Sequence, residues 1–542
     1  MNYICMKNFF NYNKKYLHYS NIQRLCSNFS NDKMVYIETY GCQMNFNDSE
    51  IAMSILKSDG YTHTTNLKEA SVILLMTCAI REGAEDKIWD RLKYYHGINK
   101  RSSKLKIGVL GCMAERLKSK LLENTIAPVN LVCGPDAYRD LPRLLKEIKA
   151  GRKGMNVALS LEETYADITP VRLSSKGIPS AFVSIMRGCD NMCTYCIVPF
   201  TRGKERSRRI DSILKEVQTL SDQGIKEIVL LGQNVNSYRD MSESNEVHGV
   251  ISKEKTKLAD GFSTVYKPKI GGRRFVDLLD AVSQVNKEIR IRFTSPHPKD
   301  FPDEVLHLIR ATPNICKQLH LPAQSGSSTV LQNMGRGYTR EAYLNLVDKV
   351  RVIIPNVALT SDFISGFCGE TEEDHQLTLS LLKYVRYNFI FCYPYSMREK
   401  TKAFHRLIDD VSDEIKSCRH LELAAAFRQI TLEINQSHIG SIQLVLIDGT
   451  SKRSSNEWVG RNEANTKVIF PKLSLPFNND LITNSEIPQI GDYVAVKIIA
   501  ATSQTLKGDP ICRSSIATFN SEIINSGNNT ISQNKIPHQC YS

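Results

Sequence analysis

The sequence lacks any run of about 20 apolar residues, the length that a membrane-spanning helix needs. Its longest apolar stretches, such as Val72–Met76 and Ile228–Leu231, are only long enough for β-strands. The sequence also lacks the apolar core of a secretory signal, so its 15 cysteines are not expected to form the disulfides of a secreted protein. We therefore expect no membrane insertion and mostly free thiols.

Acidic residues are absent from positions 1–30, where Lys7, Lys14, Lys15 and Arg24 occur. A basic leader without acids and without a long apolar core is typical of a mitochondrial presequence, and a disordered tail is the alternative. Residues 1–33 are therefore predicted to be a presequence or a disordered leader, and the mitochondrial matrix is the expected location.

The whole chain has a formal net charge of +13. Such an excess favours a polyanionic partner, because each contacted phosphate releases condensed counterions. Nucleic acid is the partner class that this charge indicates.

The first part of the chain, residues 34–150, alternates short apolar runs with helical patterns, which predicts a parallel sheet. Its predicted strands are Val35–Tyr40, Val72–Met76 and Ile107–Leu110, and its predicted helices are Asp48–Lys57, Glu82–Tyr95 and Glu115–Leu122. Cys42, Cys78 and Cys112 each follow one of these strands. Ligands bind beyond the carboxyl ends of the strands in such sheets, so the three cysteines are expected to converge.

A second alternating series spans residues 175–430 and predicts a partial (β/α) barrel with its chemistry at the carboxyl ends of the strands. Its predicted strands are Phe182–Met186, Ile228–Leu231, Ile289–Phe293, Gln318–Leu321, Ala358–Ile364 and Asn388–Tyr393. The polar residues 240–272 are interpreted as a surface insertion.

The pattern changes at residue 437, where strands follow one another without helices. Gln443–Ile447, Thr466–Phe470 and Tyr493–Ile499 predict a small antiparallel β-barrel over residues 437–505, and residues 506–542 are predicted to be a disordered tail. The overall fold class is therefore α/β with a C-terminal β-barrel.

The strongest chemical motif is the run from Arg187 to Cys196, in which Cys189, Cys193 and Cys196 lie on one short loop. Thiolates are the usual ligands of iron–sulfur clusters. A structural zinc ion would need four protein ligands, and no fourth Cys or His follows nearby. Three thiolates on a four-iron cluster leave one iron open for an exchangeable ligand.

This Cys-x3-Cys-x2-Cys loop resembles that of the radical S-adenosylmethionine superfamily, and Tyr195 fits the aromatic position before the third cysteine. The resemblance implies that S-adenosylmethionine binds the open iron and is cleaved reductively to a 5′-deoxyadenosyl radical.

Three sequence motifs resemble the amino-terminal domain of the methylthiotransferases. They surround Cys42 (Glu38 to Asn45), Cys78 (Thr77 to Arg81) and Cys112 (Gly108 to Ala114). On spacing alone the signal is weak, and three buried thiols would be the better interpretation. The resemblance implies a second 4Fe-4S cluster on these cysteines, which carries the sulfur or methylthio group to be transferred.

Further stretches that resemble this family are Leu231 to Asn236, Thr294 to Pro298, His320 to Gly326 and Asp362 to Thr371, although Cys368 stands where the family usually has proline. Within them, the candidate S-adenosylmethionine contacts are Gly232, Gln233, Asn234, Gln324, Ser325 and Gly366. Each of them is equally suited to an ordinary turn.

Two basic regions are candidates for contact with RNA. One is the run of Arg202, Lys204, Arg206, Arg208 and Arg209, which suits phosphate or cofactor. The other is the C-terminal barrel, which resembles the RNA-binding TRAM module and carries Lys452, Arg453, Arg461 and Lys467. Trp458 and Phe470 there are candidates either for base stacking or for the core.

Over about residues 34–505 the chain is identified as a member of the MiaB-type tRNA methylthiotransferases. The stretches Pro394 to Ala403 and Arg406 to Val411 resemble the eukaryotic mitochondrial branch, named cyclin-dependent kinase 5 regulatory subunit-associated protein. The resemblance implies that N6-isopentenyladenosine at tRNA position 37 is methylthiolated at carbon 2. It also implies two S-adenosylmethionine molecules per product, an electron-donating reductase, tRNA as partner and a monomer.

Two alternatives stay open at this point. One is a methylthiotransferase for threonylcarbamoyladenosine in tRNA or for a ribosomal protein, and the other is a non-enzymatic kinase regulator. A regulator has no need of an open iron, so intact cluster cysteines favour an enzyme.

Overall fold

The structure is a computed structural model that describes residues 33–79, 82–102, 105–173, 177–242, 258–264, 270–477 and 485–527. The predicted presequence up to residue 32, and residues 243–257 and 265–269 of the predicted insertion, lie outside the described residues.

The chain divides into two compact units. The first contains Met1–Gly41, Ala52–Cys78 and Gly83–Val157, and the second contains Cys42–Ile51, Ala79–Glu82 and Ala158–Ser542. The segment predicted as one domain over residues 34–150 is therefore interrupted twice, because Cys42–Ile51 and Ala79–Glu82 group with the second unit.

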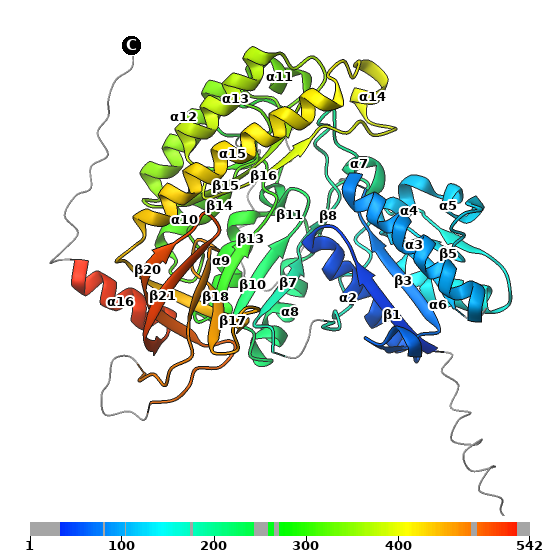
Figure 1. The fold of residues 1–542 in the computed structure, drawn as a ribbon, viewed down its shortest axis with the longest axis horizontal. Coiled ribbons are helices and arrows are strands. Elements are labelled where there is room, and N and C mark those ends of the chain that lie inside the picture. Colours follow the sequence, from blue (N-terminus) through cyan, green and yellow to red (C-terminus); the bar gives the residue numbers. More distant parts are fainter. Residues whose placement is uncertain are drawn as a thin grey trace, which may run out of the picture. The chain divides into compact units, whose positions relative to one another are not determined.

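The first unit is built on a six-stranded parallel sheet with the order β2-β1-β3-β4-β5-β6 (Figure 1). The predicted strands form its centre, and the extra ones are too short to give an apolar run. The strands are β1 (Met34–Thr39), β2 (Thr62–His63), β3 (Val72–Thr77), β4 (Lys106–Gly111), β5 (Leu131–Cys133) and β6 (Gly154–Asn156). Every residue of β3 is buried, as expected for a central parallel strand.

Five α-helices lie between the strands of this sheet in the described part of the chain. They are α2 (Gln43–Ser58), α3 (Glu82–Ser102), α4 (Cys112–Leu117), α5 (Ser119–Glu123) and α6 (Leu141–Lys149). Of these, α2, α3 and α4 begin at or within four residues of Cys42, Cys78 and Cys112. The single helix predicted over Glu115–Leu122 is wrong, because Lys118 has a φ of 50° and breaks it into α4 and α5.

The second unit contains all six strands predicted for the barrel series, arranged as two three-stranded parallel sheets. They are β7 (Ser180–Ser184), β10 (Glu227–Leu231) and β13 (Arg290–Phe293) in one sheet, and β14 (Gln318–His320), β15 (Ala358–Ser365) and β16 (Phe389–Pro394) in the other. An isolated parallel bridge joins Ile291 to Ile315 at the point where the series passes between them.

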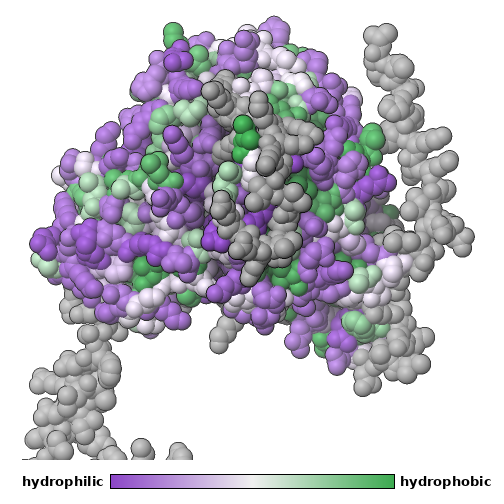
Figure 2. All heavy atoms as spheres, turned by 180° about the vertical axis from the view of Figure 1, so that it is seen from behind, coloured by the Kyte–Doolittle hydropathy of each residue, from purple (hydrophilic) through white to green (hydrophobic). Residues whose placement is uncertain are grey.

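Helices connect these strands and share one hydrophobic core with them. They are α8 (Ile210–Asp222), α9 (Phe275–Val285), α10 (Asp303–Ala311), α12 (Arg340–Ile353), α13 (Glu372–Val385) and α15 (Asp413–Ser437). Two short strand pairs, β8 (Met186–Arg187) with β9 (Arg206–Ser207) and β11 (Arg239–Asp240) with β12 (Arg273–Arg274), lie at the loops. Within the described residues no helix is apolar over the length that would cross a membrane, and hydrophilic residues dominate the face seen in Figure 2.

The C-terminal strands form a closed barrel in the order β17-β18-β19-β21-β20. They are β17 (Ile442–Thr450), β18 (Glu457–Arg461), β19 (Lys467–Pro471), β20 (Tyr493–Ala501) and β21 (Thr505–Ser514). The barrel is not wholly antiparallel as predicted, because β19 and β21 pair in parallel to close it. Trp458 and Phe470 are buried in its core and are therefore not base-stacking residues.

The prediction of a disordered tail from residue 506 is wrong for its first part. β21 continues to Ser514, and α16 (Ile516–Gly527) follows it. The Glu288 carboxylate accepts hydrogen bonds from the amides of Ile516 and Ala517 and so satisfies the start of this helix. Residues 528–542 lie outside the described residues.

Two arginines of β13 join the barrel to the sheet. Arg290 donates to the carbonyls of Leu444 and Arg461, and Arg292 donates to those of Asn462 and Glu463. Both arginines are buried, so these bonds form away from water.

Candidate active site

Cys189, Cys193 and Cys196 lie on the loop that follows β7 and β8, at the carboxyl end of the sheet, as predicted. Gly188 shapes the start of this loop with a φ of +75°, and an added Cβ there would lie 2.0 Å from the Lys204 carbonyl oxygen. The Gly188 amide donates to the Gln233 side-chain oxygen at 2.6 Å. Gln233, predicted to contact S-adenosylmethionine, therefore holds the cysteine loop.

The three thiols of this loop influence one another. Burial raises the pKa of the Cys189 thiol well above its usual value, and Cys196 and Cys193 raise it further. Burial and then Cys193 raise the pKa of Cys196 to about 12. Deprotonation is therefore costly for the protein alone, and bound iron would offset this cost. Three neighbouring sulfurs, with Cys189 and Cys193 buried and Cys196 half-buried, are the donor set that an iron–sulfur cluster uses.

Arg336 is a residue of this site that the sequence analysis missed. It is buried, and its guanidinium donates to Cys193 Sγ and to the Tyr195 hydroxyl at 3.5 Å, and to the Pro322 carbonyl at 2.8 Å. The guanidinium therefore places a fixed positive charge next to the Cys193 sulfur. The sequence feature that could have pointed to Arg336 is its position between Gly335 and Gly337.

Two further candidates for S-adenosylmethionine contacts pack within the protein near this loop. An added Cβ at Gly232 would lie 2.5 Å from Met186 Cγ, so close packing requires glycine there. The buried Asn234 amide donates to Asp300 at 3.0 Å and accepts from the His297 amide at 3.0 Å. Asn234 thus connects two strand-following loops, and its ligand contact stays a prediction.

The remaining candidates follow β14 and β15. Gln324 has a φ of +71°, an unusual conformation for a non-glycine residue, and its backbone bonds to Asp362 and Ile364 of β15. Ser325 is buried, and its hydroxyl lies 3.3 Å from the Thr378 hydroxyl and accepts from the Ser327 amide. The backbone of this loop is therefore held at β15, beside the turn that contains Gly366.

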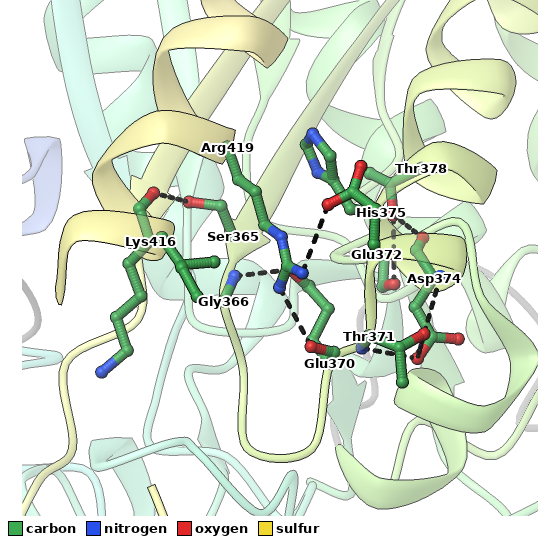
Figure 3. Close-up of polar contacts among 12 residues, drawn as sticks. Ser365, Gly366, Glu370, Thr371, Glu372, Asp374, His375, Thr378, Lys416 and Arg419 are labelled. Atoms are coloured by element: carbon green, nitrogen blue, oxygen red, sulfur yellow. Dashed lines mark hydrogen bonds and ion pairs between the residues drawn. The ribbon is translucent and has the colours of Figure 1, made fainter. Parts of the chain in front are cut away.

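Gly366 lies in a turn that α15 fixes from one side (Figure 3). Its amide donates to Glu370 at 2.8 Å, and the same carboxylate oxygen accepts from Arg419 at 3.0 Å. An added Cβ at Gly366, whose φ is +70°, would lie 2.3 Å from Lys416 Cγ. The structure thus explains the glycine by contact with Lys416, and its predicted ligand contact is not tested.

The second set of cysteines follows three neighbouring strands of the first sheet. Thr77 of β3 pairs with Gly111 of β4, and Cys78 and Cys112 come directly after them as buried cysteines. Cys42 follows β1, is half-buried and belongs to the second unit. Among the described residues no three His, Cys, Asp or Glu side chains surround a point suited to a single metal ion. Cysteines at strand ends are nevertheless the donor set that a cluster uses.

Three of the five residues of the basic run after Cys196 have partners within the protein, whereas Lys204 and Arg209 are exposed. Arg202 bonds to Asn45 and Asp48, Arg206 to the Ser160 and Arg202 carbonyls, and Arg208 to Glu216. All three arginines are buried, so they organise the protein instead of facing a ligand.

Three family models match separate segments of the chain. Residues 34–134 match the uncharacterized protein family UPF0004, residues 183–382 the radical SAM superfamily, and residues 436–511 the TRAM domain.

Curated relatives align over most of the chain. The "Mitochondrial tRNA methylthiotransferase CDK5RAP1" of Rattus norvegicus is 58% identical over 491 residues, 89% of this chain and 82% of that protein. The human protein of the same name is 56% identical over 89% of this chain and 82% of its own length. The "tRNA-2-methylthio-N(6)-dimethylallyladenosine synthase" of Chloroherpeton thalassium is 48% identical over 88% of this chain and 96% of that protein.

Proposed function

The chain belongs to the radical S-adenosylmethionine methylthiotransferases, and from this membership we propose that it converts N6-isopentenyladenosine at position 37 of tRNA into its 2-methylthio form. The observation that carries the proposal is the pair of three-cysteine sets at the carboxyl ends of two parallel-strand systems. The dimethylallyl group in the bacterial relatives' name is the same as the isopentenyl group and supports this substrate.

Each cysteine set has its own part in the proposal. Cys189, Cys193 and Cys196 would hold a four-iron cluster with one open iron, and Cys42, Cys78 and Cys112 would hold the second cluster. When bound, these groups with S-adenosylmethionine supply the radical and the sulfur that an unreactive aromatic C–H bond requires. The protein positions the first loop through Gln233, places the Arg336 cation against Cys193 and keeps Cys189 and Cys193 largely away from water.

The test is mass spectrometry of nucleosides from mitochondrial tRNA of cells with and without the protein. We expect 2-methylthio-N6-isopentenyladenosine to disappear without the protein and N6-isopentenyladenosine to accumulate. Cys42→Ala should not restore the product, although the purified variant should still cleave S-adenosylmethionine. A missing methylthio-threonylcarbamoyladenosine, or an unmodified ribosomal protein, would instead support one of the other substrates.

Mitochondria are the proposed location, in agreement with the names of the animal relatives. Positive charges in a leader are drawn into the matrix by the membrane potential, at about 2.3 kcal/mol per charge per 100 mV, and the first 30 residues have no acid to oppose this. A fusion of residues 1–40 to a fluorescent protein should enter mitochondria. A diffuse cytosolic signal would contradict the location and leave the enzymatic proposal intact.

A further inference from the structure

Asp48 is a fully buried carboxylate that bridges two buried arginines. Its Oδ1 accepts from Arg187 at 2.7 Å, and its Oδ2 accepts from Arg202 at 2.8 Å. The Asp48 side chain is 0% exposed, and those of Arg187 and Arg202 are 2% and 4% exposed. A buried charge is tolerated only with partners of this kind, so the three side chains have one favourable arrangement.

The two arginines stand at the two ends of the radical loop, which we define as Gly188–Phe200. Arg187 directly precedes the loop, and Arg202 follows it on the carboxyl side of Cys196. Arg187 is held further by the Tyr165 ring, 4.7 Å from its guanidinium carbon, and Arg206 donates to the Arg202 carbonyl at 2.9 Å. One carboxylate therefore fixes both ends of the loop.

Asp48 itself lies on α2, six residues after Cys42. The start of this helix has other contacts with the same elements. Arg202 donates to the Asn45 side chain at 3.0 Å, Asn47 donates to the Phe182 carbonyl at 3.2 Å, and Met44 packs against Val229 and Leu231. The residues after Cys42 are thus bound to β7, to β10 and to the two arginines that flank the radical loop.

We propose that Asp48 is a positioning residue that fixes the segment after Cys42 to both ends of the radical loop and so couples radical formation to sulfur transfer. This inference rests on the proposed function, in which Cys42 belongs to the sulfur-carrying set. The physical reason is that the radical must meet its target at a set distance, and a misplacement of about 1 Å costs on the order of 100-fold in rate.

The test is Asp48→Asn in the full chain, anaerobically reconstituted and supplied with tRNA, S-adenosylmethionine and dithionite. Two quantities are measured, 5′-deoxyadenosine and the methylthio nucleoside. We expect 5′-deoxyadenosine to form, while methylthio nucleoside per 5′-deoxyadenosine falls about tenfold or more. Iron content should equal that of the unaltered protein.

The matched control is Glu227→Gln. Glu227 is also a 0% exposed carboxylate that bridges two arginines, Arg292 at 2.7 Å and Arg461 at 3.0 Å, but it lies far along the chain from Cys42. This variant should keep the product ratio. Hydrogen–deuterium exchange gives a second readout: Asp48→Asn should raise exchange in both the start of α2 and the radical loop, and Glu227→Gln in neither.

Asp48→Asn leaves one guanidinium poorly paired, so a second variant guards against misfolding. Asp48→Asn combined with Arg202→Met removes one positive charge with the negative one and should show the same loss of coupling.

The outcomes separate the two proposals. If the unaltered protein makes no methylthio nucleoside, the proposed function is wrong and the inference fails with it. If it makes the product and the Asp48 variants keep its ratio to 5′-deoxyadenosine, or lose both in equal proportion, only the inference is overturned.

Discussion

At the residue scale, we expect six cysteine side chains to set how much iron the protein binds. Because each three-cysteine set would hold its own four-iron cluster, we expect about eight irons per reconstituted chain. Replacing Cys189, Cys193 and Cys196 together by alanine should leave about four. Colorimetric iron and sulfide assays measure both values, and a variant that loses all of its iron or none of it would show that the sites are not independent.

Glu50 is the residue for which we predict a pH effect on stability. Burial raises its pKa to about 7, although Leu173 donates a backbone hydrogen bond to it. The unfolded chain loses this proton near pH 4.5 and the folded chain keeps it to about pH 7, so the free energy of unfolding falls as pH rises through this window.

Glu50→Gln keeps an acceptor for Leu173 and removes the charge. At pH 8 we expect the variant to be more stable than the unaltered protein by up to about 3 kcal/mol, and at pH 4 about equally stable. Urea unfolding at both pH values measures this difference. An equal effect at the two pH values would mean that Glu50 ionises normally in the folded protein.

Short sequence motifs were enough to predict the cysteine loops, because each loop is no more than ten residues long. The fate of Arg202 was not predictable, since its partner Asp48 lies 154 residues away and only folding brings them together. The same holds for Arg336, which contacts Cys193 at a separation of 143 residues. The basic run in the sequence therefore predicted a ligand site, whereas three of its arginines are buried and bond to other groups of the protein.

At the scale of elements, the turn after β15 is expected to tolerate no side chain at Gly366. Gly366→Ala must adopt a φ of +70° and also displace Lys416, whose Cγ would lie 2.3 Å from the new Cβ. We expect lower thermal stability and a loss of S-adenosylmethionine cleavage.

Gly224→Ala is the matched control for this prediction. Gly224 has a similar φ of +81°, but nothing lies within 4 Å of the added Cβ, so only the backbone cost of roughly 1 kcal/mol applies. Differential scanning fluorimetry and a 5′-deoxyadenosine assay compare the two variants. If both variants lost thermal stability and S-adenosylmethionine cleavage equally, the clash with Lys416 would not be the cause.

β21 gives the next element-scale prediction. It pairs with β19 and β20, and Leu506 lies in the barrel core. A chain that stops after Gln504 should therefore lose the closed barrel and aggregate, whereas one that stops after Gly527 should keep its melting temperature. Solubility and circular dichroism distinguish them, and a soluble, fully folded shorter chain would contradict the role of β21.

The two barrel strands that sequence analysis missed share a physical cause. β18 and β21 contain Gly460, Gly508 and Pro510, residues that weaken a strand pattern. They form strands because they pair with neighbouring strands of the barrel. A short stretch of sequence does not reveal such pairing between distant residues. The apolar runs of β3, β10 and β15 needed no such help, so their positions were predicted to within a few residues.

At the scale of the whole molecule, we expect the barrel's exposed lysine and arginine side chains to bind tRNA phosphates. Arg461 is not among them, because Asp448 and Glu227 engage it. Replacing the exposed Lys452, Arg453 and Lys467 by alanine should weaken tRNA binding. The log–log salt slope should shrink by about 0.7–0.9 for each phosphate that the variant no longer neutralises.

Binding titrations at several salt concentrations measure this slope. A control that removes the same charge elsewhere should leave it unchanged: Lys215→Ala with Lys287→Ala and Lys383→Ala, all exposed and outside the barrel. Similar slopes for both triple variants would mean that net charge, and not the barrel surface, sets the affinity.

The hydrogen bonds that join β13 to the barrel have a consequence for the evolution of this protein's sequence. Arg290 and Arg292 bind main-chain carbonyls at positions 444 and 461–463. Every amino acid presents the same carbonyl, so mutations that alter a side chain at these positions leave these four bonds in place. The Arg461 side chain is constrained separately, because it also pairs with Glu227. Lineages can therefore change the side chains at positions 444 and 462 while these main-chain bonds still join the barrel to the catalytic strands.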